Sequence, residues 1–250
     1  MTINFKTQKP LKEYDAVSLA EMLRTGFVQE FPAPVVQKLQ DAIQVASYLH
    51  RNDVRRGSRG TSTNPPYIEH PLRVALRMFQ NFKVDDPNVI IAAVLHDTVE
   101  DHARDFADFE GVAASTTEGA AGQNALAFIS RHFGFPVART VELVSNPPIN
   151  PGATKAEKIQ AYQEHVIKAV NMSSEALIVK VSDFIDNAGS LHHHYSYGDQ
   201  KVGYFLDRYE PLLEVYRGAL LKEGHNFWVA KVRERLDDVE AQFDKFRSAA

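Results

Sequence analysis

The chain has 250 residues, 44% of them hydrophobic, and a formal net charge of −4. This is ample material for one sizeable core, and the weak charge provides no general attraction to nucleic acids or anionic membranes. The absence of cysteine excludes disulfides, thiol catalysis and cysteine-ligated zinc or iron–sulfur centres. The N-terminus has no apolar signal core and no apolar run is long enough to span a membrane, so we expect a cytoplasmic protein.

Helical periodicity recurs along almost the whole chain, which predicts an all-α bundle. Apolar residues at helical spacing predict helices over 34–51, 71–82, 124–133, 136–144, 156–170, 174–191, 204–221 and 227–246. We expect Gly134 to end the helix over 124–133 and a serine to cap the start of the helix over 174–191. A further helix should start at Asp86-Pro87, because a capping aspartate followed by proline favours a helix N-terminus. Residues 57–66 and 103–123 are predicted to be exposed loops. We expect an N-terminal extension over 1–33, a main domain over 34–221 and a C-terminal helical extension over 222–250.

Acidic groups gather at the end of the apolar segment that follows Asn88. Seven apolar residues are followed by His96, Asp97, Glu100 and Asp101. On a continuous helix these four side chains share one arc of about 140°. A helix that is apolar around most of its girth is usually buried, and three carboxylates at its end repel one another unless a cation neutralises them. We therefore predict a metal site with acid/base groups beside it.

Two other segments supply candidate ligands. His70 stands at the start of a predicted helix, and Asp183 stands at the end of another apolar run, with Asn187 one turn later on the same face. Taken alone, His70 is typical of a capping or surface histidine and Asp183 of a surface aspartate. A set of two histidines and two aspartates suits manganese, iron, zinc or magnesium.

A basic cluster follows the predicted helix over 34–51, in a chain that is acidic overall. It contains Arg51, Arg55, Arg56 and Arg59. Guanidinium groups suit a polyanionic substrate, although a solvated basic turn explains the same pattern. His50 ends the helix, where it is predicted to interact with the helix dipole and not to be a ligand.

Four ordered motifs in this sequence resemble those of the HD-domain phosphohydrolases, which hold a metal with His…His-Asp…Asp. The resemblance is closest to the hydrolase domain of the RelA/SpoT family and to the free-standing small alarmone hydrolases. The matching segments are LHRNDVRR at 49–56, YIEHP at 67–71, HDTVED at 96–101 and VKVSDFIDN at 179–187. The chain departs from the pattern by extra residues between Arg56 and Tyr67, by a long loop after Asp101 and by Ile185-Asp186 where Leu-His is usual.

The resemblance implies an HD-type helical bundle that removes the 3′-pyrophosphate of guanosine tetra- or pentaphosphate, giving GDP or GTP and pyrophosphate. It implies one manganese ion per chain, with magnesium, iron or zinc as less expected metals. The implied metal ligands are His70, His96, Asp97 and Asp183. The implied acid/base residues, which orient a water and take its proton, are Glu100 and Asp101. The implied substrate contacts are Arg55, Arg56, Asn187 and Lys201.

Three alternatives to the hydrolysis of guanosine alarmones are open for the same residues. A nucleoside 5′-monophosphatase of the HD type would use the same ligands but does not explain Glu100 and Asp101 beside an arginine cluster. A hydrolase of an adenosine alarmone or of another 3′-phosphorylated nucleotide stays open, because base choice depends on pocket shape. An HD-fold antitoxin or binding module has no need of filled acid/base positions. The sequence names no toxin partner.

Overall fold

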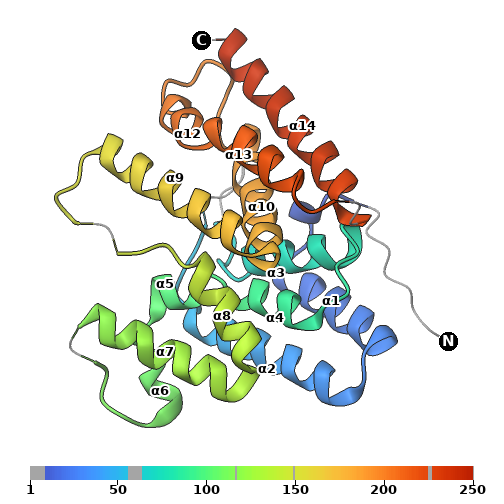
Figure 1. Cartoon of the computed structure of the whole chain (residues 1–250), viewed down its shortest axis with the longest axis vertical. Coiled ribbons are helices and arrows are strands. Elements are labelled where there is room, and N and C mark those ends of the chain that lie inside the picture. The colour runs from blue at the N-terminus through green and yellow to red at the C-terminus, as the bar shows by residue number, and fades with distance from the viewer. Residues whose placement is uncertain (1–8, 56–63, 116, 149, 225–226, 250) are drawn as a thin grey trace. The chain divides into compact units, whose positions relative to one another are not determined.

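The computed structural model describes residues 9–55, 64–115, 117–148, 150–224 and 227–249. Within these ranges the chain is helical, and its β pairing is limited to an isolated bridge between Val54 and Pro66, which confirms the all-α prediction (Figure 1). None of the described helices is long and apolar enough to cross a membrane. Contacts between Cα atoms divide the chain into two units: Met1–Arg55 with Pro65–Ser145, and Arg56–Asn64 with Asn146–Ala250.

The first unit is built around a helix that is apolar on every side. Its elements are the 3-10 helix η1 (Leu11–Glu13), α1 (Ala16–Glu30), α2 (Ala33–Leu49), α3 (Glu69–Leu76), the π turn η2 (Arg77–Asn81), α4 (Pro87–Leu95), α5 (Thr98–His102), α6 (Ala107–Glu110), α7 (Glu118–Phe133) and α8 (Phe135–Val144). Helix α4 contacts α2, α3 and α8 (Figure 1). As predicted, Asp86 caps α4 by accepting a hydrogen bond from the Asn88 N–H at 2.8 Å.

Helix α1 contributes directly to the core of the first unit. Its side chains Leu19, Leu23 and Phe27 are fully buried, and the helix contacts α2 and α3. Gly26 permits a close approach, because a Cβ at this position would overlap the ring of Phe79. The structure therefore integrates much of the segment before residue 33 into this core, while the domain boundaries at 33 and 221 stay predictions.

The second unit surrounds helix α10. Its helices are α9 (Lys155–Met172), α10 (Ser174–Ala188), α11 (Leu191–His194), α12 (Val202–Tyr209), α13 (Pro211–Leu220) and α14 (Phe227–Ser248). Helix α10 contacts α9, α12, α13 and α14, and residues 176–186 are all buried. The Ser173 side chain caps α10 by accepting from the Ala176 N–H at 3.0 Å, which agrees with the expected serine cap.

Two predicted segments differ in the structure. The helix expected over 204–221 is two helices, because Pro211 lacks an N–H and its ring clashes with the preceding turn. The loop expected over 103–123 is shorter: it contains α6 and the buried Phe106, and α7 already begins at Glu118. Most of the loop expected over 57–66 lies outside the described residues.

Candidate metal centre and active site

The segment that carries the predicted acid/base groups is not one unbroken helix. Helix α4 ends at Leu95 and α5 begins at Thr98, with His96 and Asp97 in the turn between them. Both turn residues keep right-handed helical dihedrals, and the Thr98 hydroxyl donates to the Leu95 carbonyl at 2.7 Å. The Asp101 N–H donates to the Asp97 carbonyl at 2.9 Å. The single arc expected for these side chains on one continuous helix is therefore only approximate, but the acidic groups still lie on consecutive turns.

Three of the predicted ligands come together in the first unit. Ligand atoms of His70, His96 and Asp97 all lie within 4.8 Å of one another. The Asp97 oxygens lie 3.1 Å from His96 Nε2 and 3.5 Å from His70 Nε2. Both histidines are buried, with 1% and 2% of their surface exposed. The arrangement gathers the neutral and anionic donors that a divalent cation needs.

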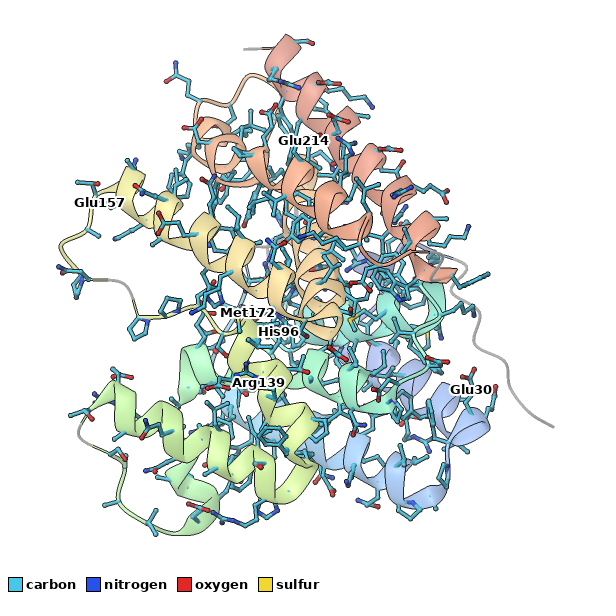
Figure 2. All side chains as sticks on the ribbon, in the orientation of Figure 1. Glu30, His96, Arg139, Glu157, Met172 and Glu214 are labelled. Carbon is cyan, nitrogen blue, oxygen red and sulfur yellow. The ribbon has the colours of Figure 1, made fainter. Side chains whose placement is uncertain are left out.

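The orientation of His96 (labelled in Figure 2) fits a cation at this position. Its Nδ1 lies 2.8 Å from the Ala93 carbonyl oxygen. A carbonyl only accepts, so Nδ1 carries the proton, and in the neutral ring Nε2 presents a lone pair. That lone pair faces the carboxylate of Asp97, and two acceptors at this distance require a proton or a metal ion between them.

A tyrosine that was not predicted as a site residue holds the carboxylate of Asp97. The Tyr67 hydroxyl donates to Asp97 Oδ2 at 2.8 Å. Burial on its own raises the pKa of Asp97, but His96, His70 and this hydrogen bond together hold it well below its usual range. Asp97 is thus an anion ready to bind a cation. The sequence feature that could have identified Tyr67 as a site residue is its position three residues before His70 in the YIEHP segment.

Glu100 and Asp101 lie on α5, just after the turn that carries His96 and Asp97, and both residues are exposed. The carboxyl group of Asp101 is nevertheless enclosed enough to be partly desolvated. This desolvation, together with repulsion from Asp97 and Glu100, raises the pKa of Asp101 to about 7. A carboxyl group with a pKa near neutrality can exchange a proton with a reacting water.

The other predicted ligand, Asp183, belongs to the second unit, on α10. Its carboxylate accepts a hydrogen bond of 2.6 Å from Asn187 Nδ2, one turn later on the same helix. Such an outer partner fixes the orientation of a ligating carboxylate. Whether Asp183 joins the three predicted ligands of the first unit stays a prediction. So does the substrate role of Lys201, which is exposed just before α12.

Of the arginine cluster, the structure describes Arg51 and Arg55, while Arg56 and Arg59 lie outside the described residues. The guanidinium of Arg55 lies 5.2 Å from the centre of the Tyr67 ring, which places a cation beside the tyrosine that contacts Asp97. The guanidinium of Arg51 instead donates to the carbonyl of Tyr48, at 2.7 Å, at the end of α2.

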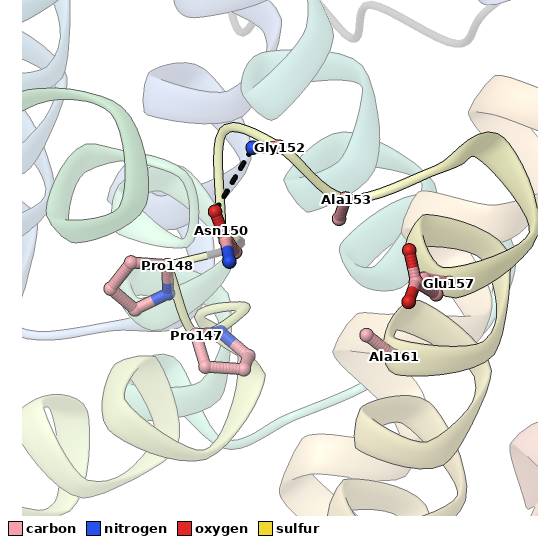
Figure 3. A pocket seen from close by; sticks show the side chains of 7 residues that line it. All are labelled: Pro147, Pro148, Asn150, Gly152, Ala153, Glu157 and Ala161. Atoms are coloured by element: carbon pink, nitrogen blue, oxygen red, sulfur yellow. Dashed lines mark hydrogen bonds between the residues drawn. The ribbon is translucent and has the colours of Figure 1, made fainter.

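A separate pocket of about 390 Å³ lies in the second unit (Figure 3). It is lined by Pro147, Pro148, Asn150, Gly152, Ala153, Glu157 and Ala161. The Asn150 side chain accepts from the Gly152 N–H at 2.9 Å, and the Glu157 carboxylate accepts from the Thr154 N–H at 2.7 Å. Because its polar side chains serve the local backbone and none is a predicted site residue, this pocket is not the candidate active site.

Comparison with known proteins points to one group. The HD domain family matches residues 67–188. The guanosine-3′,5′-bis(diphosphate) 3′-pyrophosphohydrolase MESH1 of Danio rerio is 33% identical over 153 residues, which cover 61% of this chain and 68% of the relative. The MESH1 protein of Homo sapiens is 31% identical over 154 residues, 62% of this chain and 69% of the relative.

Two further matches extend the comparison. A guanosine-3′,5′-bis(diphosphate) 3′-pyrophosphohydrolase of Aquifex aeolicus is 30% identical over 62% of this chain, but the match covers 18% of that longer protein. A solved structure described as "A metazoan ortholog of SpoT hydrolyzes ppGpp and plays a role in starvation responses" aligns with a TM-score of 0.54 at 21% identity. That alignment covers 82% of this chain and 94% of the other, and it shows a shared fold.

Proposed function

The chain belongs to the HD-domain family that includes the guanosine-3′,5′-bis(diphosphate) 3′-pyrophosphohydrolases, and on this basis we propose that it hydrolyses guanosine tetra- or pentaphosphate. The products are pyrophosphate with GDP or GTP. The observation that carries this proposal is the His70–His96–Asp97 group, whose two histidines are buried, followed one turn later by Glu100 and Asp101. We expect the enzyme to act in the cytoplasm on alarmones of the stringent response.

We further propose that His70, His96, Asp97 and Asp183 hold one manganese ion, with magnesium, iron or zinc as less suitable occupants. The donor set fits, because a histidine lone pair and a carboxylate face each other in the first unit and need a proton or a metal ion between them. When bound, the ion supplies Lewis-acid polarisation of the 3′ phosphoryl group.

The chain's own carboxylates handle the proton of the attacking water. Asp101 takes this proton, and Glu100 orients the water. The water oxygen bonds to the phosphorus beside the ribose 3′ oxygen, the bond from that phosphorus to the 3′ oxygen breaks, and the 3′ oxygen gains the proton that Asp101 took from the water. A carboxylate in this position contributes roughly 10²–10⁴-fold to the rate, and the pKa of Asp101, about 7, suits the task.

Side-by-side assays test the substrate. Guanosine and adenosine 3′,5′-bis(diphosphates) are incubated with the manganese-loaded protein, and the nucleotide products are separated by chromatography. Release of GDP and pyrophosphate from the guanosine compound, with slower turnover of the adenosine compound, supports the proposal. Faster turnover of the adenosine compound would assign the enzyme to a different alarmone, and no turnover of either would favour an HD-fold binding module or antitoxin.

Arg55→Ala is expected to raise KM by roughly tenfold or more while leaving kcat nearly unchanged. The physical reason is that a hydrogen bond to a charged partner contributes about 1.5–3 kcal/mol, and Arg55 lies over Tyr67, which contacts Asp97. Steady-state kinetics measure the effect, with Arg139→Ala as an exposed control on α8. Arg56→Ala should behave like Arg55→Ala. Unchanged KM in both variants would make the cluster a solvated turn.

Tyr67→Phe is expected to weaken manganese binding by roughly 10–100-fold, the usual effect of removing an outer partner of a ligand. The variant loses the hydroxyl that donates to Asp97 at 2.8 Å but keeps the ring. Calorimetric titration of metal-free protein measures the affinity. Because Tyr67 only positions Asp97, kcat should recover at saturating manganese; a permanent loss of kcat would instead place the hydroxyl in contact with the reacting groups.

A further inference from the structure

A second cluster of metal-binding side chains lies in the first unit and shares no residue with the first. Ligand atoms of His50, Asp53 and His102 all lie within 4.8 Å of one another. Asp53 Oδ2 lies 2.8 Å from His50 Nδ1 and 2.6 Å from His102 Nε2, so both rings direct a nitrogen at the same oxygen. We propose that this cluster is a second divalent-cation site, with two imidazoles and one carboxylate suited to Zn²⁺.

The surroundings of His102 resemble those of a ligating histidine. While Nε2 faces Asp53, the opposite ring nitrogen, Nδ1, lies 2.9 Å from Asp105 Oδ2. A histidine that binds a metal through one nitrogen usually donates its other N–H to a carboxylate. That hydrogen bond fixes the orientation of the ring and makes the first nitrogen a stronger metal ligand. Asp105 provides this partner. The sequence contains the pattern twice, as His50-Arg-Asn-Asp53 and His102-Ala-Arg-Asp105.

Exposure gives the cluster a closed side and an open side. The side chain of His50 is fully buried, that of His102 is 16% exposed and that of Asp53 is 35% exposed. An ion can therefore enter past Asp53 and keep a water as an additional ligand, which completes the four-coordinate geometry that zinc prefers.

A proton occupies the same place when no ion is present. His102 contacts the carboxylates of Asp53 and Asp105 through its two nitrogens, and both contacts are hydrogen bonds only if both nitrogens are protonated. Burial lowers the pKa of His102, but these two hydrogen bonds outweigh burial and raise it. A bound cation replaces the proton on Nε2, so its affinity must fall as the pH is lowered.

The proposed ion would link the end of α2 to the end of α5, and both segments carry candidate active-site residues. His50 and Asp53 lie at the end of α2, next to Arg55, whereas His102 ends α5, which carries the acid/base pair. The ring of His50 also stacks on Tyr67, with centroids 4.6 Å apart. A cation held between these segments stabilises their arrangement, because a ligand that binds only the folded state raises its stability.

Cobalt titration of the metal-free full chain tests the proposal, because Co²⁺ at a four-coordinate histidine–carboxylate site absorbs visible light. The wild type should bind about one more equivalent than His102→Gln. His132→Gln, which alters an exposed histidine on α7, should bind as much as the wild type. Asp97→Ala should retain the equivalent that His102→Gln loses. Equal stoichiometry in His102→Gln and the wild type would overturn the proposal.

A second variant guards against misfolding of His102→Gln. Asp53→Asn keeps the size of a residue that is partly exposed but weakens its oxygen as a ligand. In an Asp97→Ala background, Zn²⁺ should raise the melting temperature by several degrees, and addition of Asp53→Asn should abolish that rise. The same rise in both proteins would refute the second site. Turnover of guanosine alarmones by the manganese-loaded wild type is measured separately, so failure of this test leaves the proposed hydrolysis unaffected.

Discussion

Glu100→Gln and Asp101→Asn are each expected to lower kcat for alarmone hydrolysis by roughly 10²–10⁴ while the protein keeps its metal. Both replacements preserve size and shape but remove the ability to accept a proton. The two residues follow the turn that carries Asp97, one helical turn beyond it. A single ion cannot readily accept His96, Asp97 and both of these carboxylates from one short segment. We therefore expect Glu100 and Asp101 to orient the water and take its proton.

Metal content and turnover must be measured on the same preparation. Glu118→Gln makes the same chemical change on an exposed side chain at the start of α7, and it should match the wild type in both measurements. Loss of metal from Glu100→Gln or Asp101→Asn would recast that residue as a ligand. Full activity with metal retained would show that the pair is only a structural feature of the helix.

The pH dependence of kcat/KM separates the two residues further. A general base must be deprotonated, so activity should fall as the pH drops through the pKa of Asp101. Repulsion from Glu100 is one cause of the raised pKa of Asp101. Glu100→Gln should therefore move the acid limb to lower pH, whereas Asp101→Asn should remove it. Unshifted acid limbs in both variants would mean that another group is the base.

Local signals in the sequence predicted much of this fold. A helix end depends on only a few neighbouring residues, so it can be predicted from a short stretch of sequence. The structure confirms three such ends: Asp86 before a proline, Gly134 after an apolar helix and a serine cap on α10. Gly134 has a φ of 102°, which favours glycine. Periodicity alone missed the break at His96 and Asp97, because both residues keep helical dihedrals and leave no trace in the apolar pattern.

Contacts between residues far apart in the chain could not be predicted from the sequence pattern. His50 lies at the end of α2, as expected, but the sequence did not predict that its ring contacts Asp53 and stacks on Tyr67. The contact between Asp53 and His102 joins residues far apart in the chain, and no periodicity encodes it. The acidic end of an apolar segment predicted a metal site at His96 and Asp97, but His70 was joined to them only because short motifs and their order resemble a known family. Such a resemblance carries tertiary information that composition lacks.

Asp183→Asn is expected to lower manganese content by about one ion per chain, as Asp97→Ala should, and to lower activity by more than about 100-fold. That bound follows because removing even an outer partner of a ligand costs roughly 10–100-fold in affinity or activity. The amide of Asn is neutral and a much weaker ligand than a carboxylate, while its size preserves the packing of α10, where Asp183 is 7% exposed.

Graded variants distinguish a ligand from a structural carboxylate on α10. Asn187→Ala removes only the group that donates to Asp183 at 2.6 Å, so its loss of metal affinity should stay within roughly 10–100-fold. Asp207→Asn, on the exposed surface of α12, should change nothing. If Asp183→Asn keeps wild-type metal content and turnover, the ion is held by His70, His96 and Asp97 without help from α10. If only KM rises, Asp183 and Asn187 contact the substrate instead of the metal.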